Sequence, residues 1–169
     1  MRWNEEKATS EGNWPEPVQR VAGVLRDARV EARIEEFSED TRTAADAASA
    51  AGAPIEQIVK SLVFAGDSRP LVVMVPGHLR ADTTKIAAAV GCMRVKHVGA
   101  DAVERLTGFP PGGVAPFPLP GIDTVLIDQT LLGHEVVWIG AGSSRHMAVL
   151  TPGDLVRLAR ARPALLTVE

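Results

Sequence analysis

The chain has 169 residues, of which 46 % are apolar and 23 % charged, and this is the composition of one globular domain and not of a disordered chain. Its formal net charge of −3, from 18 basic and 21 acidic residues, argues against a protein that coats duplex DNA through a broad basic face. The single cysteine, Cys92, excludes an intramolecular disulfide and argues against a cysteine-based zinc site.

The first fourteen residues are polar and aperiodic, and we interpret 1–14 as a flexible arm before one domain over 15–169. In this arm, Trp3 and Trp14 could each fill a surface groove. The start of the chain lacks the basic and then apolar pattern of a secretory signal. No apolar run reaches the roughly 18 residues of a membrane span. We therefore expect a cytoplasmic protein with no membrane partner.

Helical and strand signals alternate irregularly over the first half of the domain. In chain order, the predicted elements are a helix that begins after Pro15, a strand over 32–37 and an alanine-rich helix over 43–51. Thr41 or Thr43 can cap the second helix, and Gly52 can end it. Two apolar runs over 57–66 and 70–77, joined by a Gly-Asp-Ser-Arg turn, predict a buried β-hairpin.

The second half of the chain adds shorter elements. They are a helix over 83–90 capped by Asp82, a strand over 93–98 and a short helix over 101–106. Strands over 124–128, 135–140 and 146–150 follow, and then a helix over 152–159 capped by Thr151 and a last strand over 164–169. Strict alternation of strand and helix is absent. The pattern therefore favours an α+β domain with a mixed, curved, barrel-like sheet over a doubly wound one.

Lys60 interrupts an apolar strand and is the most unusual residue of the sequence. Alternation places it on one face with Ile58, Leu62 and Phe64. A lysine on an apolar face is costly unless its ammonium group reaches water or an anion. Two interpretations stay open: an ammonium that extends past a sheet edge, or a cation that lines a cleft and holds a phosphate or carboxylate.

The segment 110–121 is the second unusual feature, with five prolines and three glycines in twelve residues. Prolines stiffen a chain, and glycines allow a ligand to approach backbone groups. The segment is either a rigid connection or a preformed backbone cradle for a small ligand.

Polar residues after two predicted strands are further candidates. The turn over 140–146 exposes backbone amides, but it lacks the third glycine and the helix of a dinucleotide fingerprint. Asp128 ends an apolar strand, where it could face a site or cap a following helix. The four histidines show no metal-ligand spacing, and we expect no metal and no cofactor.

Six segments together resemble the YbaK/EbsC family, which is similar to the editing (insertion) domain of bacterial prolyl-tRNA synthetase. In chain order they are QIVKSLVF, LVVMVPG, LTGFPPGGVAPF, TVLIDQTLL, VWIGAGSSRH and LTPGDLVRL. The resemblance covers about two thirds of the chain, from Ile55 to the C-terminus. It implies a trans-editing deacylase that hydrolyses tRNA mischarged with a small amino acid such as Cys, Ala, Ser or Thr, on tRNA(Pro) in some members.

The resemblance also implies the site. It assigns catalytic roles to Lys60, Gly112 and Asp128, and substrate binding to Gly113, Val114, Ala115, Pro116, Gly140, Gly142, Ser143 and His146. The implied partners are the CCA end and acceptor stem of charged tRNA, with a synthetase as a candidate source of tRNA specificity. DNA is not an expected partner. The alternative is a non-catalytic module that captures tRNA ends or a nucleotide.

Overall fold

The computed structural model describes residues 13–168. Its helices are α2 (Glu16–Ala28), α3 (Ala44–Ala51), α4 (Thr83–Val90), α5 (Ala100–Thr107) and α6 (Pro152–Ala159), with short 3₁₀ helices η1 (Ile55–Gln57) and η2 (Gln129–Gly133). Its strands are β1 (Arg33–Glu36), β2 (Val59–Gly66), β3 (Arg69–Pro76), β4 (Arg80–Ala81), β5 (Val95–His97), β6 (Thr124–Asp128), β7 (Val137–Ser143), β8 (His146–Leu150), β9 (Arg162–Ala164) and β10 (Thr167–Val168).

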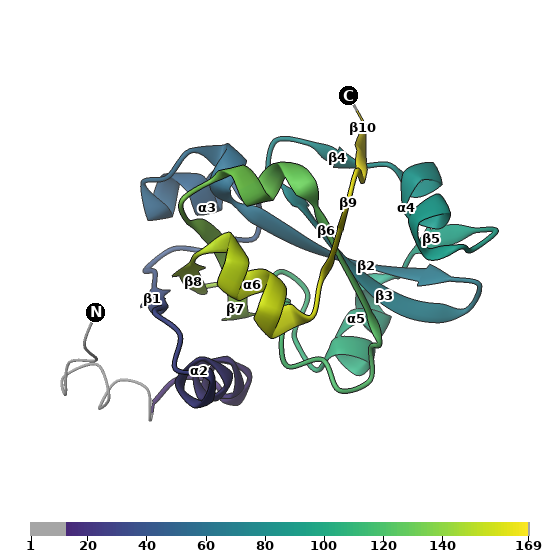
Figure 1. Ribbon diagram of the computed structural model, residues 1–169. Helices are drawn as coiled ribbons and strands as arrows, with labels where there is room; N and C mark the ends of the chain where they lie inside the picture. The colour runs from purple at the N-terminus through teal and green to yellow at the C-terminus, as the bar shows by residue number, and fades with distance from the viewer. Residues whose placement is uncertain (1–12, 169) are drawn as a thin grey trace.

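The strands form a larger mixed sheet and a smaller antiparallel one, and β4 and β10 form a separate antiparallel pair (Figure 1). The larger sheet has the order β5-β2-β3-β6-β9, in which β2 pairs antiparallel with both neighbours and β6 pairs parallel with both of its own. The smaller sheet has the order β1-β8-β7, and a parallel bridge between Ile58 and Trp138 joins the two. The α+β class and the mixed sheet are thus confirmed. The barrel-like part of the prediction is wrong, because the larger sheet ends at β5 and β9 and does not close.

The predicted hairpin is present as β2 and β3, paired without interruption from Val59–Pro76 to Gly66–Arg69. Asp67 and Ser68 in its turn both have positive φ, at 47° and 73°. Such turns match the right-handed twist of the strands. The hairpin fixes the face on which Lys60 lies.

Side-chain caps begin three helices where the sequence predicts them. Thr43, Asp82 and Thr151 accept hydrogen bonds from backbone N–H groups in the first turns of α3, α4 and α6. Of the two cap candidates for α3, Thr43 is the cap. Thr41 instead donates its hydroxyl to the Ser144 carbonyl at 2.7 Å, which ties the segment before α3 to the β7–β8 hairpin.

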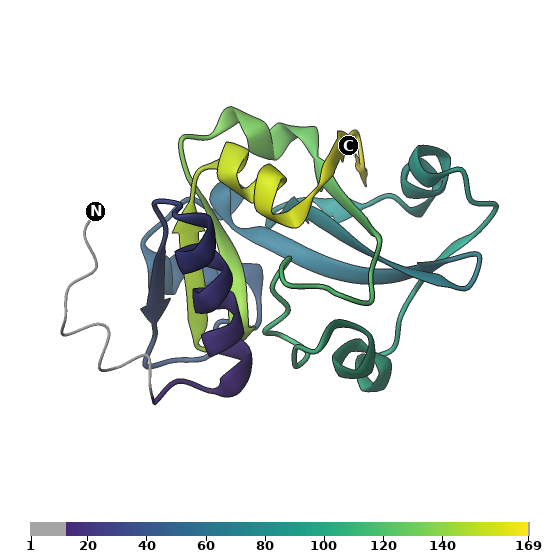
Figure 2. The ribbon, with the colours of Figure 1, turned by 60° about the horizontal axis from the view of Figure 1, so that its bottom comes forward.

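Helices cover the sheets on separate faces (Figure 2). The apolar face of α2, which is Val18, Val21, Ala22 and Leu25, packs against β7 as the periodicity predicts. On the far side of the molecule, α4 buries Ile86 against Phe64 and other residues of the β2–β3 hairpin. Within residues 13–168, no helix has both the length and the apolar character needed to cross a membrane.

The C-terminal segment differs from the prediction of one strand over 164–169. Two short strands, β9 and β10, are separated by Leu165 and Leu166. The backbone N–H of Leu166 turns inward to donate to Asp128, and β10 then pairs with β4. The apolar pattern did not predict this break between β9 and β10, because the break depends on a hydrogen bond to Asp128, which is far away in sequence.

Candidate active site

A cavity of about 550 Å³ lies between the start of β2, the N-terminal end of α3, the 110–116 loop and the β7–β8 hairpin. Six of the predicted site residues line it: Lys60, Gly112, Val114, Gly140, Ser143 and His146. The remaining five do not line it: Gly113, Ala115, Pro116, Asp128 and Gly142. Segments that are far apart in the sequence thus share one cavity.

Lys60 is half-buried on β2, and its Nζ donates to the Leu79 carbonyl oxygen at 2.6 Å. An ammonium group has three N–H donors, so two remain for other acceptors. Burial is the main cause that lowers the pKa of Lys60, and the Arg80 guanidinium lowers it further. An anion at this position would relieve both effects, because it compensates lost hydration and opposes the arginine charge. The side chain lines the cavity, and its role in holding a phosphate or carboxylate there stays a prediction.

Glycines allow the 110–116 loop to lie directly against β7. A Cβ on Gly113 would stand 2.6–2.8 Å from the backbone of Ser143, and a Cβ on Gly140 would stand 2.7 Å from the Val114 carbonyl oxygen. The Gly142 N–H donates to the Gly113 carbonyl at 3.0 Å. All three glycines thus allow close backbone packing, in the case of Gly142 also against Pro17 and Val18. Gly140 lines the cavity as well, and the substrate-binding roles that the resemblance implies for the three stay predictions.

Gly112 is the glycine of this loop that reaches the cavity. Its φ of +82° is one that L side chains rarely adopt, and it packs beside the aliphatic part of Arg42. Val114 also lines the cavity, whereas Ala115 and Pro116 turn away from it. Ala115 is buried in the main core, and Pro116 lines a second cavity of about 420 Å³ together with Phe117.

Asp128 is fully buried and lies outside the cavity. One carboxylate oxygen accepts from the Leu166 N–H at 2.8 Å, and the other accepts from the backbone N–H and the hydroxyl of Thr130. Both oxygens are therefore engaged in the fold. The geometry is that of a cap for η2, the alternative that the sequence left open, and we drop Asp128 from the candidate catalytic group.

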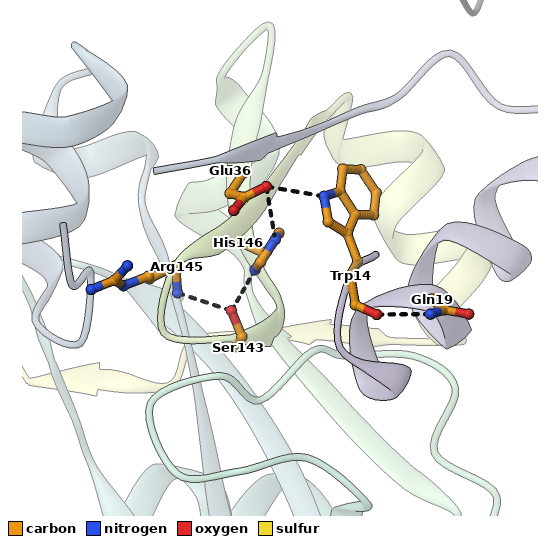
Figure 3. A network of polar contacts seen from close by, with 6 residues as sticks. All are labelled: Trp14, Gln19, Glu36, Ser143, Arg145 and His146. Atoms are coloured by element: carbon orange, nitrogen blue, oxygen red, sulfur yellow. Dashed lines mark hydrogen bonds and ion pairs between the residues drawn. The ribbon is translucent and has the colours of Figure 1, made fainter. Parts of the chain in front are cut away.

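A chain of polar side chains runs from the cavity wall to the N-terminal helix (Figure 3). Ser143 Oγ lies 2.5 Å from His146 Nδ1, and His146 Nε2 lies 3.8 Å from a carboxylate oxygen of Glu36. Trp14 Nε1 donates to that same oxygen at 3.2 Å. Burial lowers the pKa of His146, and Glu36 partly opposes this. An imidazole in this environment is neutral at pH 7.

Sequence analysis missed several contributors to this region. Thr41 and Arg42 line the cavity, and Glu36 supports it from behind. Glu36 was predicted to lie in a strand and Thr41 was a cap candidate, but their partners in the β7–β8 hairpin are more than 100 residues away in sequence. Trp14, which the sequence placed in the arm, is 8 % exposed and packs its ring against His146 at 5.5 Å. Trp3 and the rest of 1–12 lie outside the described residues.

The fold and the cavity define a small α+β domain that can enclose a compact ligand beside a lysine, a glycine-rich loop and a serine–histidine pair. In residues 13–168, no group of three metal-ligating side chains is placed to hold an ion. The model of the aminoacyl-tRNA editing domain matches residues 38–158, and the chain belongs to this family. The resemblance drawn from the six sequence segments is thereby confirmed.

Individual relatives agree with this family. The chain is 29 % identical over 123 residues to the uncharacterized protein YwhH of Bacillus subtilis, covering 72 % of this chain and 78 % of that one. It is 30 % identical over 104 residues to a proline–tRNA ligase of Limosilactobacillus fermentum, covering 59 % of this chain but 18 % of the ligase. The chain therefore corresponds to one part of that larger enzyme.

A solved structure extends the similarity to nearly the whole fold. The structure described as "a putative trans-editing enzyme for prolyl tRNA synthetase" superposes with a TM-score of 0.84 at 35 % identity. The match covers 92 % of this chain and 99 % of that one. Family and neighbours together connect the chain to aminoacyl-tRNA editing.

Proposed function

We propose that the protein is a trans-acting deacylase that hydrolyses the ester bond of mischarged aminoacyl-tRNA. The main support for this proposal is that Lys60, Gly112 and the Ser143–His146 pair line one cavity. A volume of about 550 Å³ is in the range of pockets that hold small molecules, and it suits a small amino acid esterified to a terminal ribose. An aminoacyl ester is already activated, so its hydrolysis depends on positioning and charge stabilisation.

The roles follow from the chemistry of each group. Lys60 would hold a phosphate of the CCA end with its two free N–H donors, as a point charge. The backbone at Gly112 would contact the ester and the water, where its lack of a side chain permits close approach. The apolar part of the wall, which includes Ile58 and Met147, would limit the size of the bound amino acid. Rejection of a larger, correctly attached residue would then be steric.

A deacylation panel tests this function. The purified protein would be mixed with separately mischarged tRNAs that carry Cys or Ala on tRNA(Pro) and Ser or Thr on other tRNAs, with Pro-tRNA(Pro) as the correctly charged control. We expect release of free amino acid over several turnovers from at least one mischarged tRNA and little from the control. Retention of charged tRNA without any release would instead identify a binding module.

The relatives' link to prolyl-tRNA synthetase makes tRNA(Pro) our proposed substrate tRNA. A chain of 169 residues with net charge −3 offers a small cationic surface, so tRNA identity would come from the acceptor stem or from a bound synthetase. A partner synthetase would raise the effective concentration of charged tRNA at the cavity.

We expect tRNA binding to depend weakly on salt. The cavity itself is lined by Lys60 and Arg42, and other candidates such as Lys85 are already engaged, in this case with the Thr167 carbonyl. Contact with two or three phosphates, at roughly −0.7 to −0.9 per contact, gives a slope of log K against log salt of about −1 to −3.

The measurement is the affinity for a non-hydrolysable charged tRNA across a salt series, with uncharged tRNA as the reference. A slope steeper than about −6 would mean an extensive phosphate interface. Recognition of the tRNA end alone would then have to be abandoned.

A further inference from the structure

We propose that Ser143 and His146 act together as the general base of the hydrolysis, and that Glu36 and Trp14 are positioning residues for this pair. This inference rests on the proposed deacylase function and adds to it the group that activates the water. Two of the four side chains are buried, since His146 is 4 % and Trp14 8 % exposed, while Ser143 is half-buried and Glu36 is exposed. Figure 3 shows the four in a continuous line from the β7–β8 hairpin toward α2.

The surroundings of His146 select one tautomer. Its Nε2 is buried, has no hydrogen-bond partner, and faces the Glu36 carboxylate at 3.8 Å. An ionised carboxylate only accepts hydrogen bonds, so it favours a proton on Nε2 and leaves the lone pair on Nδ1. A bridging water could join Nε2 to the carboxylate across this distance, or the two groups could move together when substrate binds. Trp14 holds the carboxylate in place through its own N–H.

This tautomer fixes the role of Ser143. With Nδ1 as acceptor, the Ser143 hydroxyl donates to it across 2.5 Å. The Arg145 N–H donates to the same Oγ at 3.0 Å and occupies one lone pair. A hydroxyl oxygen has two lone pairs, so one remains. Since Ser143 lines the cavity, it offers an acceptor there and not a donor.

The proton transfers balance through the pair. A water in the cavity gives one proton to Ser143 Oγ while the Ser143 proton passes to His146 Nδ1. The water oxygen forms a bond to the ester carbonyl carbon, and the π electron pair of the carbonyl moves onto its oxygen. The resulting imidazolium is stabilised by Glu36. When the tetrahedral intermediate collapses, the bond from carbon to the ribose oxygen breaks. The proton then returns through Ser143 to that oxygen, which releases free amino acid and tRNA.

The charges around His146 give this pair a defined pH dependence. Glu36 on β1 faces the ring, while Arg145 precedes it in the hairpin and Lys60 and Arg42 line the same cavity. Burial lowers the pKa of His146, so the neutral base predominates at pH 7 and is lost as the pH falls through that pKa. A protonated ring would donate from Nδ1 to Ser143 and could accept no further proton. The rate should therefore decline on the acid side, at a pH below the ordinary histidine value of about 6.5.

The test compares Ser143→Ala and Glu36→Gln with the adjacent controls Ser144→Ala and Glu35→Gln, using the mischarged tRNA that wild type hydrolyses best. We expect Ser143→Ala to lower kcat about 100-fold with KM within about threefold, which is the scale of one lost general base. Glu36→Gln should lower kcat about tenfold and move the acid limb to lower pH, because the charge that raises the His146 pKa is gone. Trp14→Phe keeps an aromatic ring but not the N–H and should have a smaller effect in the same direction.

A second substrate separates this role from a binding role. Deamination of the aminoacyl ester to the α-hydroxyacyl ester replaces the ammonium group with a hydroxyl of similar size. If Ser143 is part of the base, Ser143→Ala loses the same factor on both esters. An effect that is confined to KM, or that disappears with the hydroxyacyl ester, would mean that Ser143 only holds the ammonium group and would overturn the proposal. An active wild type with an unaffected Ser143→Ala variant would refute the general base alone, whereas an inactive wild type would refute the deacylase function as well.

Discussion

Replacement of Lys60 by alanine should lower kcat for deacylation at least about 100-fold while the protein remains folded. The expected factor is that of one lost charge-stabilising or positioning contact in an active site. Lys60 is the lysine that lines the cavity, and its ammonium has two donors beyond the one given to Leu79. The folded state loses about one hydrogen bond, which costs roughly 1 kcal/mol.

The matched control is Lys96→Ala, because Lys96 is an exposed lysine on β5, away from the cavity. Rates under single-turnover conditions would be compared with thermal unfolding of the same preparations. We expect the control to keep the wild-type kcat. Unchanged kcat in Lys60→Ala, with normal binding of charged tRNA, would remove Lys60 from the catalytic group.

Local rules made the first elements of the fold predictable. Thr43, Asp82 and Thr151 cap helices because the cap bond joins residues two or three positions apart. The β2–β3 hairpin is also local, since its turn residues and apolar runs are adjacent in sequence. The position of Lys60 on the cavity wall follows from this local register and the cost of burying an ammonium group.

Long-range contacts account for what the sequence did not reveal. From sequence alone, a carboxylate at the end of a strand can either face a site or cap a helix. Asp128 is a cap, and its second oxygen is occupied by the N–H of Leu166, which is distant in sequence. Glu36 and Trp14 meet His146 only after β1 has paired with β8. No spacing rule connects these three residues. The contact between Glu36, Trp14 and His146 therefore depends on the assembly of the smaller sheet.

The glycines around the cavity show a related limit. A glycine that exposes its backbone to a ligand and a glycine that admits another backbone have the same sequence signal. Gly112 has the positive φ and faces only the flexible side chain of Arg42, whereas Gly113 faces the backbone of β7 and Gly140 faces the backbone of the loop. The shape of the 110–116 loop thus depends on the packing of Gly113 against β7, and its role as a cradle for a ligand stays a prediction.

Gly113→Ala should therefore unfold the protein more easily and inactivate it as well. The added Cβ would stand 2.6–2.8 Å from three backbone atoms of Ser143, where no flexible side chain can move aside. Overpacking of this kind costs about 3 kcal/mol, the upper part of its usual range. For a domain of this size, that lowers the Tm by roughly 10 °C. A shift of about 1 Å between Gly112 and Ser143 would also reduce kcat by about 100-fold.

Gly153→Ala is the control for this variant. Gly153 lies in the first turn of α6, and a Cβ there would meet nothing within 4 Å. Alanine is favoured over glycine in a helix, so this variant should be more stable by about 0.5–1 kcal/mol and fully active. Thermal unfolding and deacylation of both variants at a temperature where both are folded would separate stability from activity. Wild-type stability and kcat in Gly113→Ala would show that the loop and β7 are not held in this close contact, and the assignment of Gly112 and Ser143 to one rigid cavity wall would be wrong.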